Sequence, residues 1–200
     1  MTILTNLLHE TRGTPLRAAS GHLQLSLIYL SHLGVSLDEV SELFQESSAQ
    51  LGQDVFAFLA SGRKKRGFFV EFGAGDGIFL SNTLMLERHH GWTGIPAEPL
   101  TEYHESIESE RRAVLDKDCV WHSTGEALNF VAAGYLSTIK AYQFADFHGQ
   151  ARALGASSLV TTVSLWDLLE RHRAPRTIDF LSVDTEGSEF EILNAFPFGS

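Results

Sequence analysis

Four short apolar runs lie along the 200-residue chain, and each is bounded by glycine, proline or charged residues. Runs of this length and composition are typical of buried parallel strands, which are apolar on both faces. The predicted strands cover residues 67–72, 92–99, 119–125 and 177–184.

Amphipathic segments separate these strands, and two of them begin with the spacing of a capping box, Ser36 with Glu39 and Ser164 with Asp167. In such a box the first side chain accepts a hydrogen bond from a backbone N–H group of the new helix. Helices that alternate with strands predict an α/β fold around a mostly parallel sheet. The predicted helices cover residues 36–46, 53–61, 80–90, 101–115, 164–175 and 188–196.

Residues 1–48 are expected to form an N-terminal helical extension, and residues 49–200 the α/β domain. The apolar stretch at 23–35 is interrupted by polar residues, which favours a core helix over a membrane span or a signal peptide. Residues 126–163 follow no clear pattern, although 127–134 and 157–163 are candidate strands. The basic run Arg63 to Arg66 is either a solvated turn after a helix or a landing patch for an anionic substrate.

Composition limits the classes of function. The formal net charge of −10 repels phosphate backbones and disfavours nucleic-acid binding. The single cysteine, Cys119, excludes an internal disulfide and a cysteine-rich zinc site, and is expected to be a small buried side chain. We therefore expect a cytoplasmic protein that binds neither nucleic acid nor a membrane.

The first predicted strand runs from Phe68 into a loop with glycines at 73, 75 and 77, preceded by Glu71. A dinucleotide-binding loop would place its third glycine at position 78, and a Walker A loop needs Gly-Lys-Ser/Thr. Glycines let the backbone turn sharply and approach a ligand closely. This pattern suits S-adenosylmethionine, for which Asp76 and backbone carbonyls are candidate acceptors of the amino group.

Glu98 ends the second predicted strand, where an acid is expected to hold the ribose hydroxyls of a nucleoside cofactor. Gly125-Glu126 follow the third strand, and Asp184 to Glu186 follow the fourth. Ligands of parallel α/β sheets bind at the carboxyl ends of the strands. These residues therefore predict one shared site.

Three segments, FFVEFGAGDGIFLSNTLMLE, GWTGIPAEP and IDFLSVDTEGSEFEIL, together resemble FkbM-type methyltransferases. This class I family uses S-adenosylmethionine and mostly methylates hydroxyls of sugars and secondary metabolites. QLGQDVF is similar to the segment that often precedes the first strand, so the resemblance covers residues 50–196. It implies a Rossmann-like class I methyltransferase sandwich with a mostly parallel sheet. Such sheets usually continue with three more strands, so the domain is expected to lack its last strands.

The resemblance also implies roles for individual residues. Asp184 and Glu186 would face the reacting centre as catalytic residues, Glu98 would bind the ribose, and residues 123–126 would lie near the adenine. The residues expected to bind S-adenosylmethionine are Glu71, Gly73, Ala74, Gly75, Asp76, Gly77, Asn82, Glu98 and Gly125.

Methyl transfer to an alcohol requires an acceptor for the hydroxyl proton. Asp184 or Glu186 is a candidate base, and Asp184 is also a candidate ligand for a divalent cation that would acidify the hydroxyl. His122 and His148 are further candidate bases. The predicted function is S-adenosylmethionine-dependent O-methylation of a sugar, a glycan or a small hydroxylated metabolite. The alternatives are a nicotinamide-dependent oxidoreductase and a truncated, non-catalytic cofactor-binding or scaffold domain.

Overall fold

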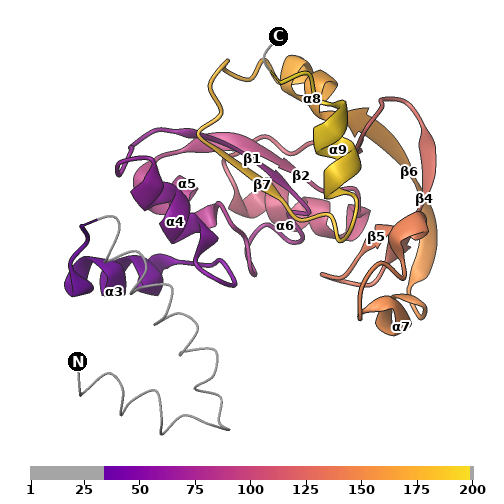
Figure 1. Ribbon diagram of the computed structural model, residues 1–200, viewed down its shortest axis with the longest axis horizontal. Helices are drawn as coiled ribbons and strands as arrows, with labels where there is room; N and C mark the ends of the chain where they lie inside the picture. Colours follow the sequence, from indigo (N-terminus) through magenta and orange to yellow (C-terminus); the bar gives the residue numbers. More distant parts are fainter. Residues whose placement is uncertain (1–33, 199–200) are drawn as a thin grey trace, which may run out of the picture.

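The computed structural model describes residues 34–198, which form an α/β fold with two sheets side by side (Figure 1). The predicted core helix at 23–35 lies almost wholly outside these residues. The α/β class is confirmed, and every predicted strand is present. The helices are α3 (Leu37–Glu46), α4 (Gln53–Ala60), α5 (Leu84–His90), α6 (Thr101–Glu110), a 3-10 helix η1 (Lys140–Tyr142), α7 (Gly149–Arg152), α8 (Leu165–Arg171) and α9 (Glu189–Ala195). The strands are β1 (Phe68–Phe72), β2 (Thr93–Ala97), β3 (Cys119–Trp121), β4 (Ala127–Ala132), β5 (Thr138–Ile139), β6 (Ala156–Ser164) and β7 (Phe180–Val183).

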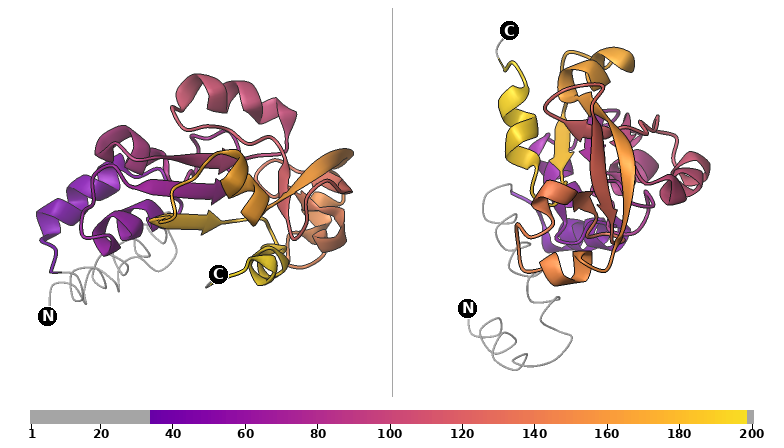
Figure 2. Two further views of the ribbon diagram at one scale, coloured as in Figure 1. Left: turned by 90° about the horizontal axis from the view of Figure 1, so that it is seen from above. Right: turned by 90° about the vertical axis from the view of Figure 1, so that its right-hand side faces the viewer.

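The first sheet has three parallel strands in the order β2-β1-β7. Seen from above, β1 lies between the other two strands, α9 lies on the β7 side and α6 on the β2 side (Figure 2). Phe72 at the end of β1 pairs with Ala97 of β2 and with Val183 of β7. The three strands therefore end at the same level, and the loops that follow them meet at one edge of the sheet.

The second sheet has the order β3-β6-β4-β5, with β3 parallel to β6 and the other pairs antiparallel. The prediction of a single, mostly parallel sheet is therefore wrong in this part of the fold. Residues 114–116 first follow β2 through hydrogen bonds from Val114 N to Gly94 O and from Asp116 N to Pro96 O. The chain then leaves β2, and β3 pairs with the nine-residue strand β6, whose other edge is occupied by β4.

Both capping residues act as predicted. The Ser36 hydroxyl accepts from Glu39 N at the start of α3, and the Ser164 hydroxyl accepts from Asp167 N at the start of α8. Three helices are shorter than the sequence indicates, and one of them, α8, ends at Arg171 instead of residue 175. α6 ends at Glu110 because the following residues join the edge of β2, and α5 begins only after residues 81–83, which bind a buried carboxylate described below.

One apolar core joins the two sheets, with side chains from β1, β2, β3, β4 and β6 packed against α8 and α9. A second core lies between β1 and the N-terminal helices and includes Val55, Phe69 and Trp92. Within residues 34–198, no helix is long and apolar enough to cross a membrane.

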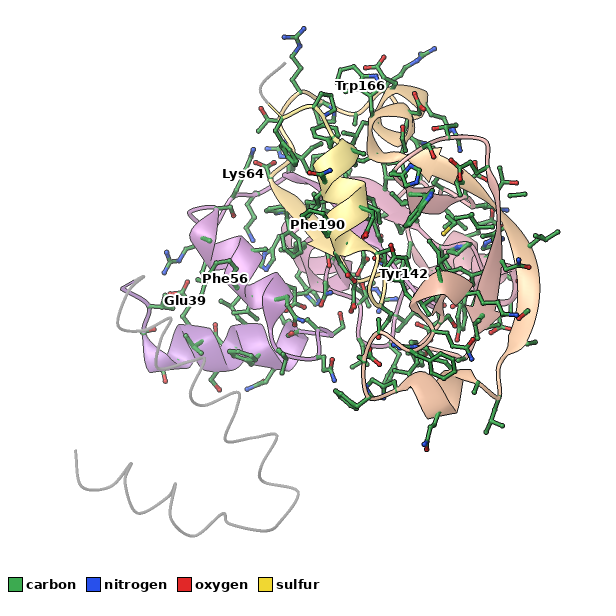
Figure 3. The ribbon with its side chains drawn as sticks, turned by 45° about the vertical axis from the view of Figure 1, so that its right-hand side comes forward. Glu39, Phe56, Lys64, Tyr142, Trp166 and Phe190 are labelled. Atoms are coloured by element: carbon green, nitrogen blue, oxygen red, sulfur yellow. The ribbon has the colours of Figure 1, made fainter. Side chains whose placement is uncertain are left out.

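The basic run after α4 contacts α3, α5 and the residue just before β7. Arg63 pairs with Glu39 of α3 at 2.5 Å, and Lys64 Nζ lies 2.7 and 2.9 Å from the carboxylate oxygens of Asp179, just before β7 (Figure 3). Lys65 Nζ lies 2.7 Å from a ring nitrogen of His90. These contacts support the turn interpretation of the basic run.

Candidate functional site

A cavity of about 280 Å³ opens where the three parallel strands end. Its position is the one expected for a ligand of an α/β sheet, and its size approaches that of small-molecule sites, about 300–1,000 Å³. Most of the predicted site residues line it. They are Glu71, Gly73, Ala74, Gly75, Asn82, Glu98, Asp184 and Glu186.

Two glycines of the loop after β1 have positive φ angles and lie in close contact with other residues. Gly73 has a φ of +71°, and a Cβ there would lie 2.0 Å from the carbonyl oxygen of Asp184. Gly75 has a φ of +54°, and a Cβ there would lie 3.1 Å from the ring of Tyr135. The backbone at these positions thus fits between the ends of the strands and remains open toward the cavity.

Glu71 lines the cavity, but its carboxylate is already hydrogen-bonded to other residues of the protein. It accepts hydrogen bonds from Asn82 N at 2.7 Å, from Thr83 Oγ1 at 2.6 Å and from Ser81 Oγ at 3.2 Å. The buried guanidinium of Arg111 lies 3.6 Å away. Glu71 therefore shapes the segment 81–83 beside the cavity, and it has little capacity left for a ligand.

Glu98, which follows β2, is 5% exposed and contacts the glycine loop at Gly75. Its two oxygens accept from Gly75 N and Leu100 N, each at 2.9 Å. Burial raises the pKa of Glu98 to about 7, and these two hydrogen bonds oppose the rise. Each carboxylate oxygen can accept a further hydrogen bond, so Glu98 retains the capacity to bind a diol.

The two acids after β7 differ sharply in their partners. Among residues 34–198, no hydrogen bond or ion pair reaches the carboxylate of Asp184, which faces the cavity. Burial, followed by the nearby charge of Glu189, raises the pKa of Asp184. Glu186 instead accepts a hydrogen bond from the fully buried guanidinium of Arg152. Arg152 also binds both carboxylate oxygens of Asp146, at 2.8 and 2.9 Å.

The sequence pattern does not predict a structure for the segment between β4 and β6. In the structure this segment contacts the glycine loop on one side of the cavity and the loop after β7 on the other. Tyr135 OH donates to Asp76 Oδ2 at 3.0 Å on the glycine-loop side. Thr138 Oγ1 donates to the carbonyl oxygens of Thr185 and Glu186, at 3.2 and 3.0 Å, on the β7 side. Tyr142 of η1 packs against Gly187, just before α9 (Figure 3). Sequence reasoning did not find Tyr135 or Arg152, because neither belongs to a recognisable motif.

Of the remaining polar residues considered for the site, His148 and Asn82 line the cavity and His122 does not. His148 lines the cavity, and its backbone N donates to Asp146 Oδ1 at 2.7 Å. His122 packs on the ring of Trp121 and does not line the cavity. Asn82 Nδ2 donates to Ser182 Oγ at 2.9 Å, whereas its buried Oδ1 has no partner among the described residues.

Three predicted ligand-binding residues lie outside the cavity lining. Asp76 accepts from Ile78 N and Phe79 N and thereby shapes the turn after the glycine loop, while Gly77 packs against Ile107. Gly125 donates its N–H to Thr162 O at 2.9 Å. Cys119 is buried, as predicted, and burial raises the pKa of its thiol to about 12. Within residues 34–198, no three His, Cys, Asp or Glu side chains are grouped to hold a metal ion.

The fold and the cavity define an α/β protein with a candidate ligand site at the ends of its parallel strands. A sequence model of the Methyltransferase FkbM domain matches residues 71–198, which is more than half of the chain. The chain therefore belongs to the FkbM methyltransferase family, and the resemblance seen in the sequence is confirmed. No curated protein and no solved structure matches the chain.

Proposed function

We propose that the protein is an S-adenosylmethionine-dependent O-methyltransferase that acts on a sugar or another small hydroxylated metabolite. The observation that carries this proposal is the carboxylate of Asp184, which faces the cavity without a partner among the described residues, beside Gly73 of the glycine loop. A carboxylate in this position is suited to accept the proton of a hydroxyl group.

The cavity has groups that suit the parts of S-adenosylmethionine, which supplies an activated methyl group when bound. Gly73 and Gly75 let the backbone approach the methionine part closely. Glu98 offers two acceptor oxygens to the ribose diol. The apolar side chains of Val120 and Phe130 line the cavity and suit the adenine, whereas residues 123–126 lie outside the lining.

The protein's part in the reaction is to align the reactants, exclude water and accept a proton. Asp184 takes the proton from the acceptor hydroxyl. Glu186 is held by Arg152 and has the positioning role of joining the loop after β7 to the segment that covers the cavity.

Transfer of radiolabel from [methyl-³H]S-adenosylmethionine to a panel of uncharged sugars, polyols and phenols tests this function. Asp184→Asn should lower the transfer rate at least about 100-fold, the range expected for loss of a general base. Glu126→Gln is the matched control, because Glu126 is exposed and lies outside the cavity lining. Transfer that survives in Asp184→Asn would contradict the role of Asp184, and the absence of labelled product from every hydroxyl compound of the panel would contradict O-methylation.

A further inference from the structure

We propose that the apolar stretch at residues 23–33 docks, within the same chain, into a groove between α4 and the outer edge of β7. This groove has a volume of about 570 Å³ and is shallower than the main cavity. Side chains of the turn before α4, of α4 itself and of residues 180–184 line it. The inference is independent of the proposed function, because it concerns a surface of the fold and needs no bound ligand.

One wall of the groove is an open strand edge. β7 is the outermost strand of its sheet, and no other strand within residues 34–198 pairs with its outer edge. Phe180, Leu181 and Val183 are only partly buried, although the strand is apolar. An apolar edge strand is a template for unwanted pairing with other chains, and proteins protect such an edge by covering it with a helix or a loop. The edge of β7 therefore indicates a surface that another segment covers.

The opposite wall is equally apolar. Leu51 precedes α4 and is 54% exposed, and Phe56 of α4 is 50% exposed (Figure 3). Both residues line the groove. Asp184, at one end, is the one charged residue among the described residues that line it. Because the groove is apolar along most of its length, it favours an occupant that is apolar and uncharged.

The stretch at 23–33 has the composition that this groove requires. Seven of its eleven residues are leucine, isoleucine or tyrosine, and none is Asp, Glu, Lys or Arg. Leu23, Leu27 and Leu30 recur at the spacing of one helix face. A helix of this length extends about 16 Å. That is enough to cover a strand of four residues, which extends about 13 Å.

The point at which this stretch joins the described chain brings it close to the groove. Val35 is 5% exposed and belongs to the second core, against which Phe180 of β7 also packs. A segment tethered so near its site has an effective concentration in about the millimolar range. A second copy of the chain would instead bring a further net charge of −10 toward the same surface and be repelled. The stretch at 23–33 is therefore favoured over a second copy.

Docking there has a consequence for the main cavity. Gln53, Asn82 and Asp184 line both the groove and the cavity, so the two hollows share a border. An occupant of the groove therefore forms a wall of the cavity on its β7 side. The docked stretch would thus be part of the surface that limits the access of water from this side.

Cross-linking in the whole chain tests the docking. The variant Leu27→Cys with Leu51→Cys places one new thiol in the stretch and one at the groove. Cys119 does not compete, because it is buried and burial raises the pKa of its thiol to about 12. A short bismaleimide should link the new thiols within one chain at least about tenfold faster than in Leu27→Cys with Glu105→Cys. Glu105 is the matched control, since it is exposed on α6, on the β2 side of the sheet (Figure 2).

Equal rates of linking in the two variants would overturn the inference, and so would links formed only between two chains. Hydrogen exchange is the second measurement, and it decides if a cysteine pair does not fold. Leu27→Asp with Leu30→Asp should speed exchange of the backbone amides at 180–183 at least about fivefold. Gln24→Glu with Ser31→Asp, which lie on another helix face, should leave this rate within about twofold of wild type. The same exchange rate in both variants would contradict the docking.

Discussion

Binding of S-adenosylmethionine should become tighter as the pH rises through 7, and Glu98 should be the cause. The carboxyl group of Glu98 is buried, and its pKa is raised from 4.5 to about 7. About half of the molecules therefore carry a protonated Glu98 at pH 7. A ribose diol donates hydrogen bonds, which favour the ionised carboxylate, so cofactor binding should expel the proton.

The size of the effect follows from the two pKa values. If the bound ribose returns the pKa of Glu98 to its ordinary value, the affinity at pH 8 should exceed that at pH 6 by about tenfold, or about 1.4 kcal/mol. About half a proton should leave for each cofactor bound at pH 7. A smaller return of the pKa gives a smaller pH dependence of the same sign.

Calorimetry at pH 7 in phosphate and in Tris measures the released proton, because the two buffers take it up with different heats. We expect different apparent enthalpies in the two buffers for the wild type. Glu98→Gln should bind more weakly and give equal enthalpies, which separates Glu98 from His148 and Asp184 in the same cavity. Equal enthalpies in the wild type, or the same buffer difference in Glu98→Gln, would refute the reasoning.

Three further predictions concern the fold that builds the site. Because the folded state binds more protons at Glu98 than the unfolded state between pH 4.5 and 7, this group should lower the free energy of unfolding by up to about 3 kcal/mol over this range; urea denaturation should show a smaller slope in Glu98→Gln than in the wild type, and equal slopes would contradict the raised pKa of Glu98. Gly73→Ala should abolish cofactor binding in calorimetry, because the new Cβ would collide with the carbonyl oxygen of Asp184. Gly62→Ala is the control: Gly62 has the same φ of +71°, but no atom lies within 4 Å of the new Cβ, so this variant should bind the cofactor and cost only about 1 kcal/mol of stability. Equal effects of the two variants on binding would contradict the contact with Asp184. Arg152→Gln should destabilise the protein, because it removes the fully buried guanidinium that binds Asp146 and Glu186; a midpoint in urea like that of the wild type would show that the ion pairs contribute nothing.

The parallel strands and the cavity could be predicted because their signals are local. Short apolar runs that end in Gly73, Glu98 and Asp184 place three loops at one edge of any parallel sheet. The capping residues Ser36 and Ser164 were likewise visible, since a cap involves residues only three positions apart. These features need no knowledge of which strands become neighbours.

The second sheet and the partners of the acids could not be predicted, because they depend on contacts between distant residues. The pairing of β3 with β6 joins segments about 40 residues apart, and no periodicity encodes it. The sequence shows Glu71 as a candidate ligand-binding acid, and only the fold shows that residues 81–83 and Arg111 take up its carboxylate. In the same way, Arg152 distinguishes Glu186 from Asp184, although the two acids are two residues apart in the sequence.

Calorimetric titration of the chain with S-adenosylmethionine, with NAD as the control ligand, tests the central claim most directly. We predict saturable binding of S-adenosylmethionine with one site per chain, no binding of NAD, and loss of S-adenosylmethionine binding in Glu98→Ala. Binding of NAD alone would contradict the claim and favour an oxidoreductase. A folded, monodisperse sample that binds neither ligand would contradict it as well and favour a non-catalytic role.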